Sequence, residues 1–170
     1  AYLDFVPPDT ILPIDINDPR IIRMRTFSKA HGMAGARVGY AIAHRNIASA
    51  FNKVRLHFGV NLVAQVGALA SLRDTKFVAD VVQAVAEGRQ EYNALAQETG
   101  LATLPSMTNF VAFDFGSSAR ADQVMNTLIS CGVFLRKPVV GGLDRLVRVT
   151  VGAPGDRAVF ADIFRAVMKE

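Results

Sequence analysis

Apolar and polar residues alternate over strand-length runs in the first part of the chain. The opening AYLDF (residues 1–5) alternates in this way and is expected to form a strand. The run IIRMRTF (residues 21–27) reads as another strand, which stops just before Lys29. A segment rich in glycine and alanine, HGMAGARVG (residues 31–39), separates it from the strand-like run VGYAIA (residues 38–43). Lys29 is therefore expected after a strand end and before a glycine-rich turn.

Helical spacing of apolar residues begins after these strands. It predicts a helix over residues 46–58, and a second helix through Leu72 that Asn61 is expected to cap. The longest periodic segment runs from Thr75, an expected N-cap, to Gly100, a residue type that commonly ends helices. A helix of this length suits a spine that joins two domains.

Strand and helix patterns alternate beyond Gly100. The expected elements, in chain order, are a strand (109–115), a helix (120–130) closed by Gly132, two strands (133–138 and 146–152) and a final helix (154–169). Pro154 suits the first turn of the last helix, where its missing amide costs no hydrogen bond. This order predicts a compact α+β unit.

The composition indicates a packed globular chain. Of its 170 residues, 51% are hydrophobic and 20% are charged, which is ample apolar material for a core. No run approaches the roughly 18 uncharged apolar residues of a membrane span. The first residues carry neither a basic leader nor an apolar signal core. We therefore expect no membrane partner and a cytoplasmic location.

Charge, histidine and cysteine positions narrow the possible chemistry. The net charge of +4 comes from basic residues scattered along the chain, so no nucleic-acid partner is expected. His31, His44 and His57 lack the spacings of metal sites, so no metal is expected. The single Cys131 lies in the apolar helical pattern LISCGV and is expected to be a buried structural thiol.

The candidate chemistry gathers around Lys29. A lysine at the end of a buried strand is partly desolvated, which favours the neutral amine that attacks an aldehyde. Ser28 offers a hydroxyl beside it, and Arg37 supplies a guanidinium fork that matches phosphate oxygens. Gly32 and Gly35 would let a ligand approach the backbone. The same residues also fit ordinary solvated charges flanking a loop, and the spacing alone leaves both interpretations open.

A family resemblance distinguishes between them. The run RTFSKAHGMAGARVGYAIA (residues 25–43) resembles the signature of fold type I, class I/II aminotransferases, and within that family the histidinol-phosphate aminotransferase branch. The resemblance implies pyridoxal 5'-phosphate as cofactor. It also implies that Lys29 is the catalytic residue, which forms a Schiff base with the cofactor aldehyde, and that Ser28 and Arg37 bind the cofactor phosphate.

Two further segments resemble the same family. The opening Ala-Tyr pair implies that the hydroxyl of Tyr2 binds the ring oxygen of the cofactor, although Tyr2 also fits an ordinary strand aromatic. In LVRVTVG the resemblance implies that Arg148 binds the α-carboxylate of the substrate, the natural partner of a bidentate guanidinium. Arg136 is a further candidate for substrate binding. Asn109 matches a frequent family asparagine that shapes the strand entrance.

The resemblance implies an α/β fold. We expect residues 1–75 to be the C-terminal part of the large cofactor-binding domain with its mixed or parallel sheet, residues 76–100 a connecting helix, and residues 101–170 a small α+β domain. The resemblance covers only about the second half of the family's usual length. We therefore expect this chain to be a fragment. The resemblance implies that four further parts of the site lie upstream of Ala1: the aspartate that pairs with the cofactor ring nitrogen, the glycine loop that binds the phosphate, the aromatic residue that stacks on the ring, and a further asparagine. We expect the intact protein to be a homodimer, and this chain alone to aggregate or fold poorly.

The implied reaction is transamination of an amino acid or amino-alcohol phosphate with a 2-keto acid. Histidinol phosphate and aromatic amino acids are the candidate amino donors. One alternative is a decarboxylase of the threonine-phosphate type, which carries a similar motif around the lysine. Another is a non-catalytic binding domain on the same scaffold. The joint presence of Lys29, Arg37 and Arg148 argues against a bare scaffold, which needs none of the three.

Overall fold

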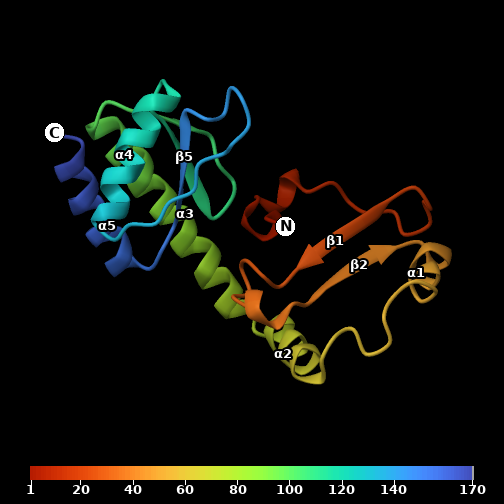
Figure 1. Ribbon diagram of the computed structural model, residues 1–170. Coiled ribbons are helices and arrows are strands. Elements are labelled where there is room, and N and C mark those ends of the chain that lie inside the picture. The colour runs from red at the N-terminus through yellow and green to blue at the C-terminus, as the bar shows by residue number, and fades with distance from the viewer. Residues whose placement is uncertain (170) are drawn as a thin grey trace. The chain divides into compact units, whose positions relative to one another are not determined.

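The chain forms two compact units, which a computed structural model describes over residues 1–169 (Figure 1). The first unit is Ala1–Val82 and the second begins at Gln83. The boundary falls within α3 (Thr75–Glu98), so one helix contributes to both units. In the part of the chain described, no helix is both long and apolar enough to cross a membrane.

The first unit is built on a two-stranded antiparallel sheet. Its elements are the 3₁₀ turns η1 (Leu3–Phe5), η2 (Pro8–Thr10) and η3 (Ala34–Ala36), the strands β1 (Ile22–Thr26) and β2 (Gly39–Ala43), and the helices α1 (Arg45–Phe51) and α2 (Leu62–Arg73). In the sheet Thr26 lies opposite Gly39. A Cβ at Gly39 would lie 2.6 Å from the carbonyl oxygen of Arg25, so the close approach of the strands requires glycine at this position.

The prediction of a strand at residues 1–5 is wrong, because the chain forms the 3₁₀ turn η1 there. The amide of Phe5 donates to the carbonyl of Tyr2 at 3.0 Å, and the Asp4 carboxylate pairs with Arg25 of β1. These bonds satisfy the segment locally. Within residues 1–169 no strand pairs with it, so the alternating pattern has no sheet to join.

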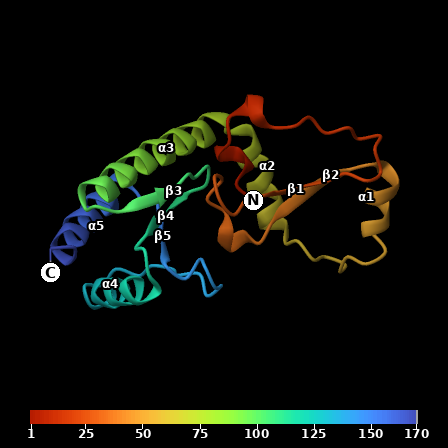
Figure 2. The same ribbon diagram turned by 90° about the horizontal axis from the view of Figure 1, so that it is seen from above.

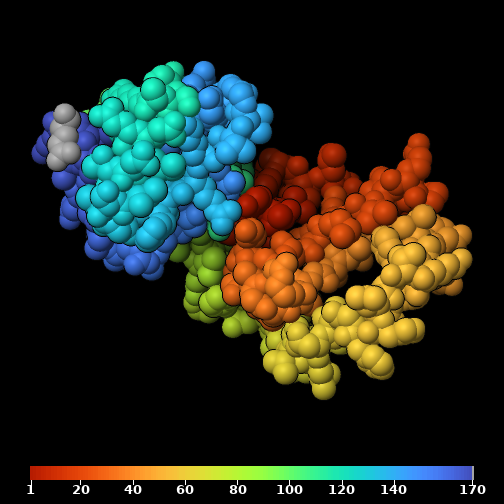
Figure 3. Space-filling model, viewed as in Figure 1, coloured from red at the N-terminus to blue at the C-terminus, as the bar shows by residue number. Residues whose placement is uncertain are grey.

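The helix expected over residues 46–58 also ends early. It stops at Phe51, and the chain then leaves the helix so that Val54 and Phe58 are 80% and 98% exposed. Phe58 adopts a left-handed backbone with φ 57°. The apolar stripe therefore has no surface within this unit against which to pack. Figure 3 shows the yellow segment that follows α1 at the surface of the unit.

The helices α2 and α3 end close to where the sequence predicts, but the N-cap of α3 is a different residue. The Oδ1 of Asn61 accepts a hydrogen bond from the amide of Ala64 at 2.7 Å, which confirms the cap of α2. The N-cap of α3 is Asp74 and not Thr75, because the Asp74 carboxylate accepts from the amide of Phe77 at 3.0 Å. Gly100 has φ 74° and ends the helix as expected.

The second unit packs helices against a three-stranded antiparallel sheet. Its further elements are β3 (Ala102–Leu104), β4 (Phe110–Asp114), α4 (Ser118–Ser130), β5 (Leu146–Thr150) and α5 (Pro154–Val167), with strand order β3-β4-β5. Figure 2 shows α3 and α5 beside these strands. The ring of Phe113 lies 5.4 Å from Phe164 and 6.2 Å from Tyr92, centroid to centroid, so one aromatic cluster joins β4, α5 and α3.

Three expectations for this unit are corrected. Residues 133–138 form no strand but a single bridge, Arg136 opposite Arg148, because Pro138 has no amide to extend the ladder. Cys131 is exposed, because α4 ends at Ser130 and Cys131 lies beyond its buried stripe of Ala121, Val124 and Leu128. The last helix ends at Val167 instead of residue 169. The short strand β3 was not expected from the sequence pattern.

Candidate active site

Lys29 lies in a tight turn held by backbone hydrogen bonds. The turn follows β1, where the amide of Ser28 donates to the Oγ1 of Thr26 at 3.1 Å. The carbonyl of Lys29 accepts from the amide of Gly32 at 2.9 Å, and Gly32 has the left-handed φ of 68°. Phe27 and Ala30, which flank the pair Ser28-Lys29, are buried. Lys29 is therefore half-buried on a rigid frame between the two strands.

Tyr2 is brought to Lys29 although 27 positions separate them in the sequence. The Nζ of Lys29 lies 5.5 Å from the centroid of the Tyr2 ring, within the range of a cation–π contact. Both side chains are half-buried. The structure thus places together two of the residues that the family resemblance selects.

Arg37 occupies a strained position at the end of the glycine-rich turn. It follows η3 with φ 53°, a left-handed backbone that costs a non-glycine residue about 1–2 kcal/mol. Its Nη1 donates to the carbonyl of Ala34 at 2.8 Å, and no carboxylate among residues 1–169 pairs with it. Strain of this kind persists at functional sites. The guanidinium is exposed and keeps further donors for an anion.

A contact that no motif indicates ties α2 to the lysine turn. The Nδ1 of His31 lies 2.7 Å from the Oγ of Ser71 in α2, 40 positions further along the chain. The His31 ring also packs on Phe27, with 4.8 Å between ring centroids. No sequence pattern links residues so far apart, so only the folded chain reveals this support for the turn.

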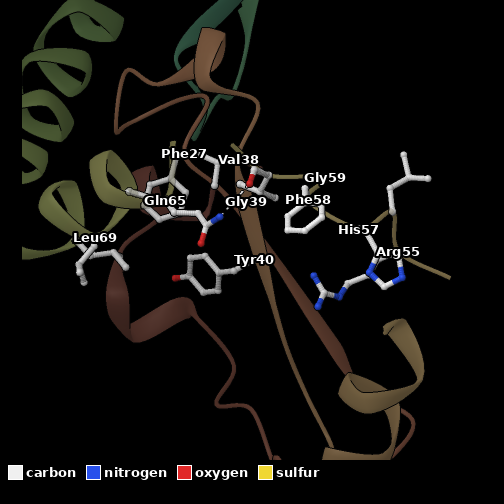
Figure 4. A pocket seen from close by; sticks show the side chains of 14 residues that line it. Phe27, Val38, Gly39, Tyr40, Arg55, His57, Phe58, Gly59, Gln65 and Leu69 are labelled. Carbon is white, nitrogen blue, oxygen red and sulfur yellow. Dashed lines mark hydrogen bonds between the residues drawn. The ribbon is translucent and has the colours of Figure 1, made fainter. Parts of the chain in front are cut away.

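One hollow of the first unit is lined partly by Phe27, next to the Lys29 turn, but not by the expected site residues. It measures about 830 Å³ and is lined by side chains of β2, the segment before α2, and α2 itself, together with Phe27. Figure 4 shows Tyr40, Phe58 and Leu69 around it, with Gln65 donating to the carbonyl of Val60 at 2.9 Å. Tyr2, Ser28, Lys29 and Arg37 do not line this hollow.

Arg148 and Arg136 form a second group, in the second unit. The amide of Arg148 donates to the carbonyl of Arg136 at 2.7 Å, and the two residues lie opposite each other in the antiparallel bridge. Side chains of such a pair project to the same side. The Nε of Arg148 is buried and has no hydrogen-bond partner among the residues described. A buried cationic donor without an acceptor is costly, so an anionic ligand would complete this position.

Asn109 acts at the entrance of β4 through its backbone. Its carbonyl accepts from the amide of Val151 at 2.9 Å, which extends the β4–β5 pairing by one bond. Any residue at this position could make the same backbone bond, so the role of the asparagine side chain stays a prediction.

Comparison with known proteins identifies the family. The profile of the aminotransferase class I and II family matches residues 1–167. The chain belongs to this family, which confirms the resemblance carried by the Lys29 motif. The chain also has the expected fold, that of the C-terminal portion of a fold type I enzyme.

The chain is similar to several histidinol-phosphate aminotransferases and, in fold, to a decarboxylase. Histidinol-phosphate aminotransferase 2 of Carboxydothermus hydrogenoformans is 35% identical over 99% of this chain and 47% of its own length. The crystal structure of histidinol-phosphate aminotransferase from Sinorhizobium meliloti, in complex with pyridoxal-5'-phosphate, has a TM-score of 0.94 at 38% identity, covering 99% of this chain and 47% of that one. L-threonine-O-3-phosphate decarboxylase from Porphyromonas gingivalis shares the fold, with a TM-score of 0.79 at 21% identity over 99% of this chain and 53% of that one. This chain thus spans about half the length of the curated relatives it matches.

Proposed function

We propose that this chain is the C-terminal part of a pyridoxal-phosphate-dependent aminotransferase. The proposed reaction is transamination of an amino acid or amino-alcohol phosphate, with histidinol phosphate and aromatic amino acids as candidate donors, and a 2-keto acid as acceptor. The observation that carries the proposal is the position of Lys29, a half-buried amine on a rigid turn with the Tyr2 ring beside its Nζ at 5.5 Å. Family membership and the histidinol-phosphate aminotransferase relatives support it.

The residues around Lys29 fit the chemical groups of this cofactor. A primary amine is the partner of an aldehyde, and a hydroxyl and a guanidinium fork are partners of a phosphate. Lys29, Ser28 and Arg37 supply these groups from one turn, and the strained backbone of Arg37 supports a role in binding. When bound, pyridoxal phosphate supplies an electron sink that stabilises negative charge at the α-carbon of the substrate.

Each of the candidate cofactor-binding residues then has a distinct task. Lys29 would hold the cofactor through its Nζ and, once released by the substrate amine, would move a proton at the α-carbon. Ser28 and Arg37 would donate hydrogen bonds to the phosphate, and the Tyr2 hydroxyl would orient the cofactor ring. The backbone bonds of the turn hold the main chain that carries Ser28 and Lys29.

Arg148 would hold the substrate by its carboxylate. Its buried Nε, which has no acceptor among residues 1–169, and its fork of N–H donors match a carboxylate. Arg136 projects to the same side of the bridge and would add a second positive charge for an acidic group of the substrate. Two guanidinium groups favour substrates that carry two anionic groups, such as a keto acid with a side-chain carboxylate.

The intact protein is proposed to act as a homodimer. The first unit exposes Val54, Leu56, Phe58 and Val63, each at 80% or more. Apolar residues gathered in one segment are costly in water and are typical of surfaces that another chain or another part of the protein covers. The division into residues 1–75, 76–100 and 101–170 is likewise proposed, with α3 as the connecting helix.

The deciding experiment is chemical labelling of the full-length protein. The protein is mixed with pyridoxal phosphate and reduced with borohydride, and the modified peptide is mapped by mass spectrometry. Lys29→Ala should abolish the label, whereas Lys53→Ala, which removes a lysine from an exposed position of the same unit, should leave it unchanged. A label scattered over surface lysines in the wild type would refute the proposal. Product analysis then separates the two reactions, since transamination converts the donor into a carbonyl compound and the 2-keto acid into an amino acid, whereas decarboxylation releases carbon dioxide.

A further inference from the structure

An aromatic ring lies against the guanidinium of Arg148. Phe110 is the first residue of β4 and pairs with Thr150 of β5, two residues beyond Arg148. Phe110 and Arg148 are therefore diagonal neighbours on one face of the sheet, within reach of long side chains. The Cζ of Arg148 lies 3.8 Å from the centroid of the Phe110 ring. At this separation the guanidinium carbon is in van der Waals contact with the ring.

This contact leaves the N–H donors of Arg148 available. A guanidinium that lies over a ring uses its face, while its N–H groups remain in the plane of the group. The buried Nε makes no hydrogen bond to any residue from 1 to 169, so no hydrogen bond at this atom fixes the side chain. The contact with the Phe110 ring is the interaction that the structure shows for this guanidinium.

We propose that Phe110 is a positioning residue, whose ring holds the Arg148 guanidinium with its donor edge presented to the substrate carboxylate. The inference rests on the proposed role of Arg148 in binding that carboxylate. Arginine loses much rotamer freedom when it is ordered, and a platform that orders it before the substrate arrives removes this cost from binding. Phe110 acts through Arg148 and does not itself contact the reacting atoms.

The test compares three variants of the full-length enzyme. Phe110→Leu keeps an apolar side chain but removes the ring, and Phe110→Tyr keeps the ring. Phe134→Leu is the matched control, because this phenylalanine of the same unit is 82% exposed. We expect Phe110→Leu to raise the KM for the 2-keto acid acceptor, which carries the carboxylate, by roughly 2-fold to 30-fold, the range for loss of a cation–π contact, with little change in kcat. Phe110→Tyr and Phe134→Leu should stay within about twofold of the wild type.

A second readout does not depend on activity. In full-length protein labelled with ¹⁵N-arginine, the Arg148 Nε–H resonance, assigned by its loss in Arg148→Lys, should be shifted upfield by the ring. Phe110→Leu should move it downfield and weaken its response to added acetate, the carboxylate probe. Phe110→Tyr should restore both properties.

The outcomes separate this inference from the proposed function. If the wild type transaminates and Arg148→Lys impairs it, but Phe110→Leu has the wild-type KM and resonance, the role of Phe110 is refuted and the proposed function stands. If the wild type shows neither labelling of Lys29 nor transamination, the proposed function fails. The acetate titration then decides the role of Phe110, because an equal response in Phe110→Leu and wild type overturns it and a weakened response upholds it.

Discussion

Gly88 in α3 lies where the second unit has no room for a side chain. A Cβ at this position would lie 2.4 Å from the Cγ1 of Val151 and 2.8 Å from the Cδ of Arg157. Carbon atoms in contact are separated by about 3.5–4.0 Å, so Gly88→Ala requires both neighbours to move by roughly 1 Å. Neither neighbour can swing into solvent, because Val151 is 8% exposed and Arg157 is 5% exposed.

The displaced Arg157 is also the centre of an ion pair. Its Nε and Nη2 donate to the two carboxylate oxygens of Glu91 at 2.7 and 2.9 Å, and its Nη1 donates to the carbonyl of Gly152 at 3.0 Å. Overpacking of this kind costs about 1–3 kcal/mol. The better helix propensity of alanine offsets about 1 kcal/mol of the cost. With the loss of ion-pair geometry added, we expect Gly88→Ala to lower the free energy of unfolding by about 1–3 kcal/mol.

The assay is urea unfolding of the full-length protein followed by far-UV circular dichroism. Gly155→Ala is the matched control, because Gly155 lies in the first turn of α5 and no atom lies within 4 Å of the position of its Cβ. Its unfolding midpoint should equal that of the wild type or exceed it. If Gly88→Ala were as stable as Gly155→Ala, the packing of α3 against Val151 and Arg157 would be refuted.

Three further predictions concern the ion pair, the sheet and the turn. Hydrogen bonding from Arg157 lowers the pKa of Glu91 in the folded protein. The pair therefore stabilises the fold fully at pH values above the pKa of glutamate in the unfolded chain, about 4.3. This stabilisation is lost as the pH falls through the lower pKa of the folded state. Urea midpoints should therefore fall less steeply between about pH 6 and pH 3 in Glu91→Gln than in the wild type, and parallel curves would contradict the pairing. Gly39→Ala should destabilise the first unit by about 1–3 kcal/mol, seen as faster amide exchange in β1 and β2, because its Cβ would lie 2.6 Å from the Arg25 carbonyl oxygen; unchanged exchange would disprove the close approach. Arg37→Gly should relieve backbone strain and stabilise the fold by about 1 kcal/mol while weakening retention of pyridoxal phosphate in dialysis, and undiminished retention would exclude Arg37 from phosphate binding.

Much of the local structure could be predicted from residues close together in the chain. The cap at Asn61, the stop at Gly100 and the strand–turn–strand around Lys29 each depend on hydrogen bonds or backbone preferences spanning a few residues. The Lys29 motif is also contiguous, so its family could be predicted from the sequence and is confirmed by comparison. The roles of Tyr2, Ser28, Lys29, Arg37, Arg136 and Arg148 stay predictions.

The errors arise where packing overrides a local pattern. Residues 1–5 alternate like a strand, but no strand among residues 1–169 pairs with them. Residues 52–58 continue a helical stripe, but they lie exposed at the surface of the first unit. Cys131 continues the spacing of a buried stripe, yet α4 ends one residue before it. In each case the periodicity is present, and the surface that would make it favourable is not provided within residues 1–169.

The family, many of the local elements and the candidate lysine could be predicted from the sequence, because they depend on contiguous residues. Which distant side chains meet is visible only in the folded chain: Tyr2 with Lys29, His31 with Ser71, Phe110 with Arg148, and Glu91 with Arg157. Hydrogen bonds within a turn join residues that are close in the sequence, so they can form whatever the rest of the fold. Cation–ring contacts, and an ion pair in which one partner is buried, are favourable only after folding has brought the partners together.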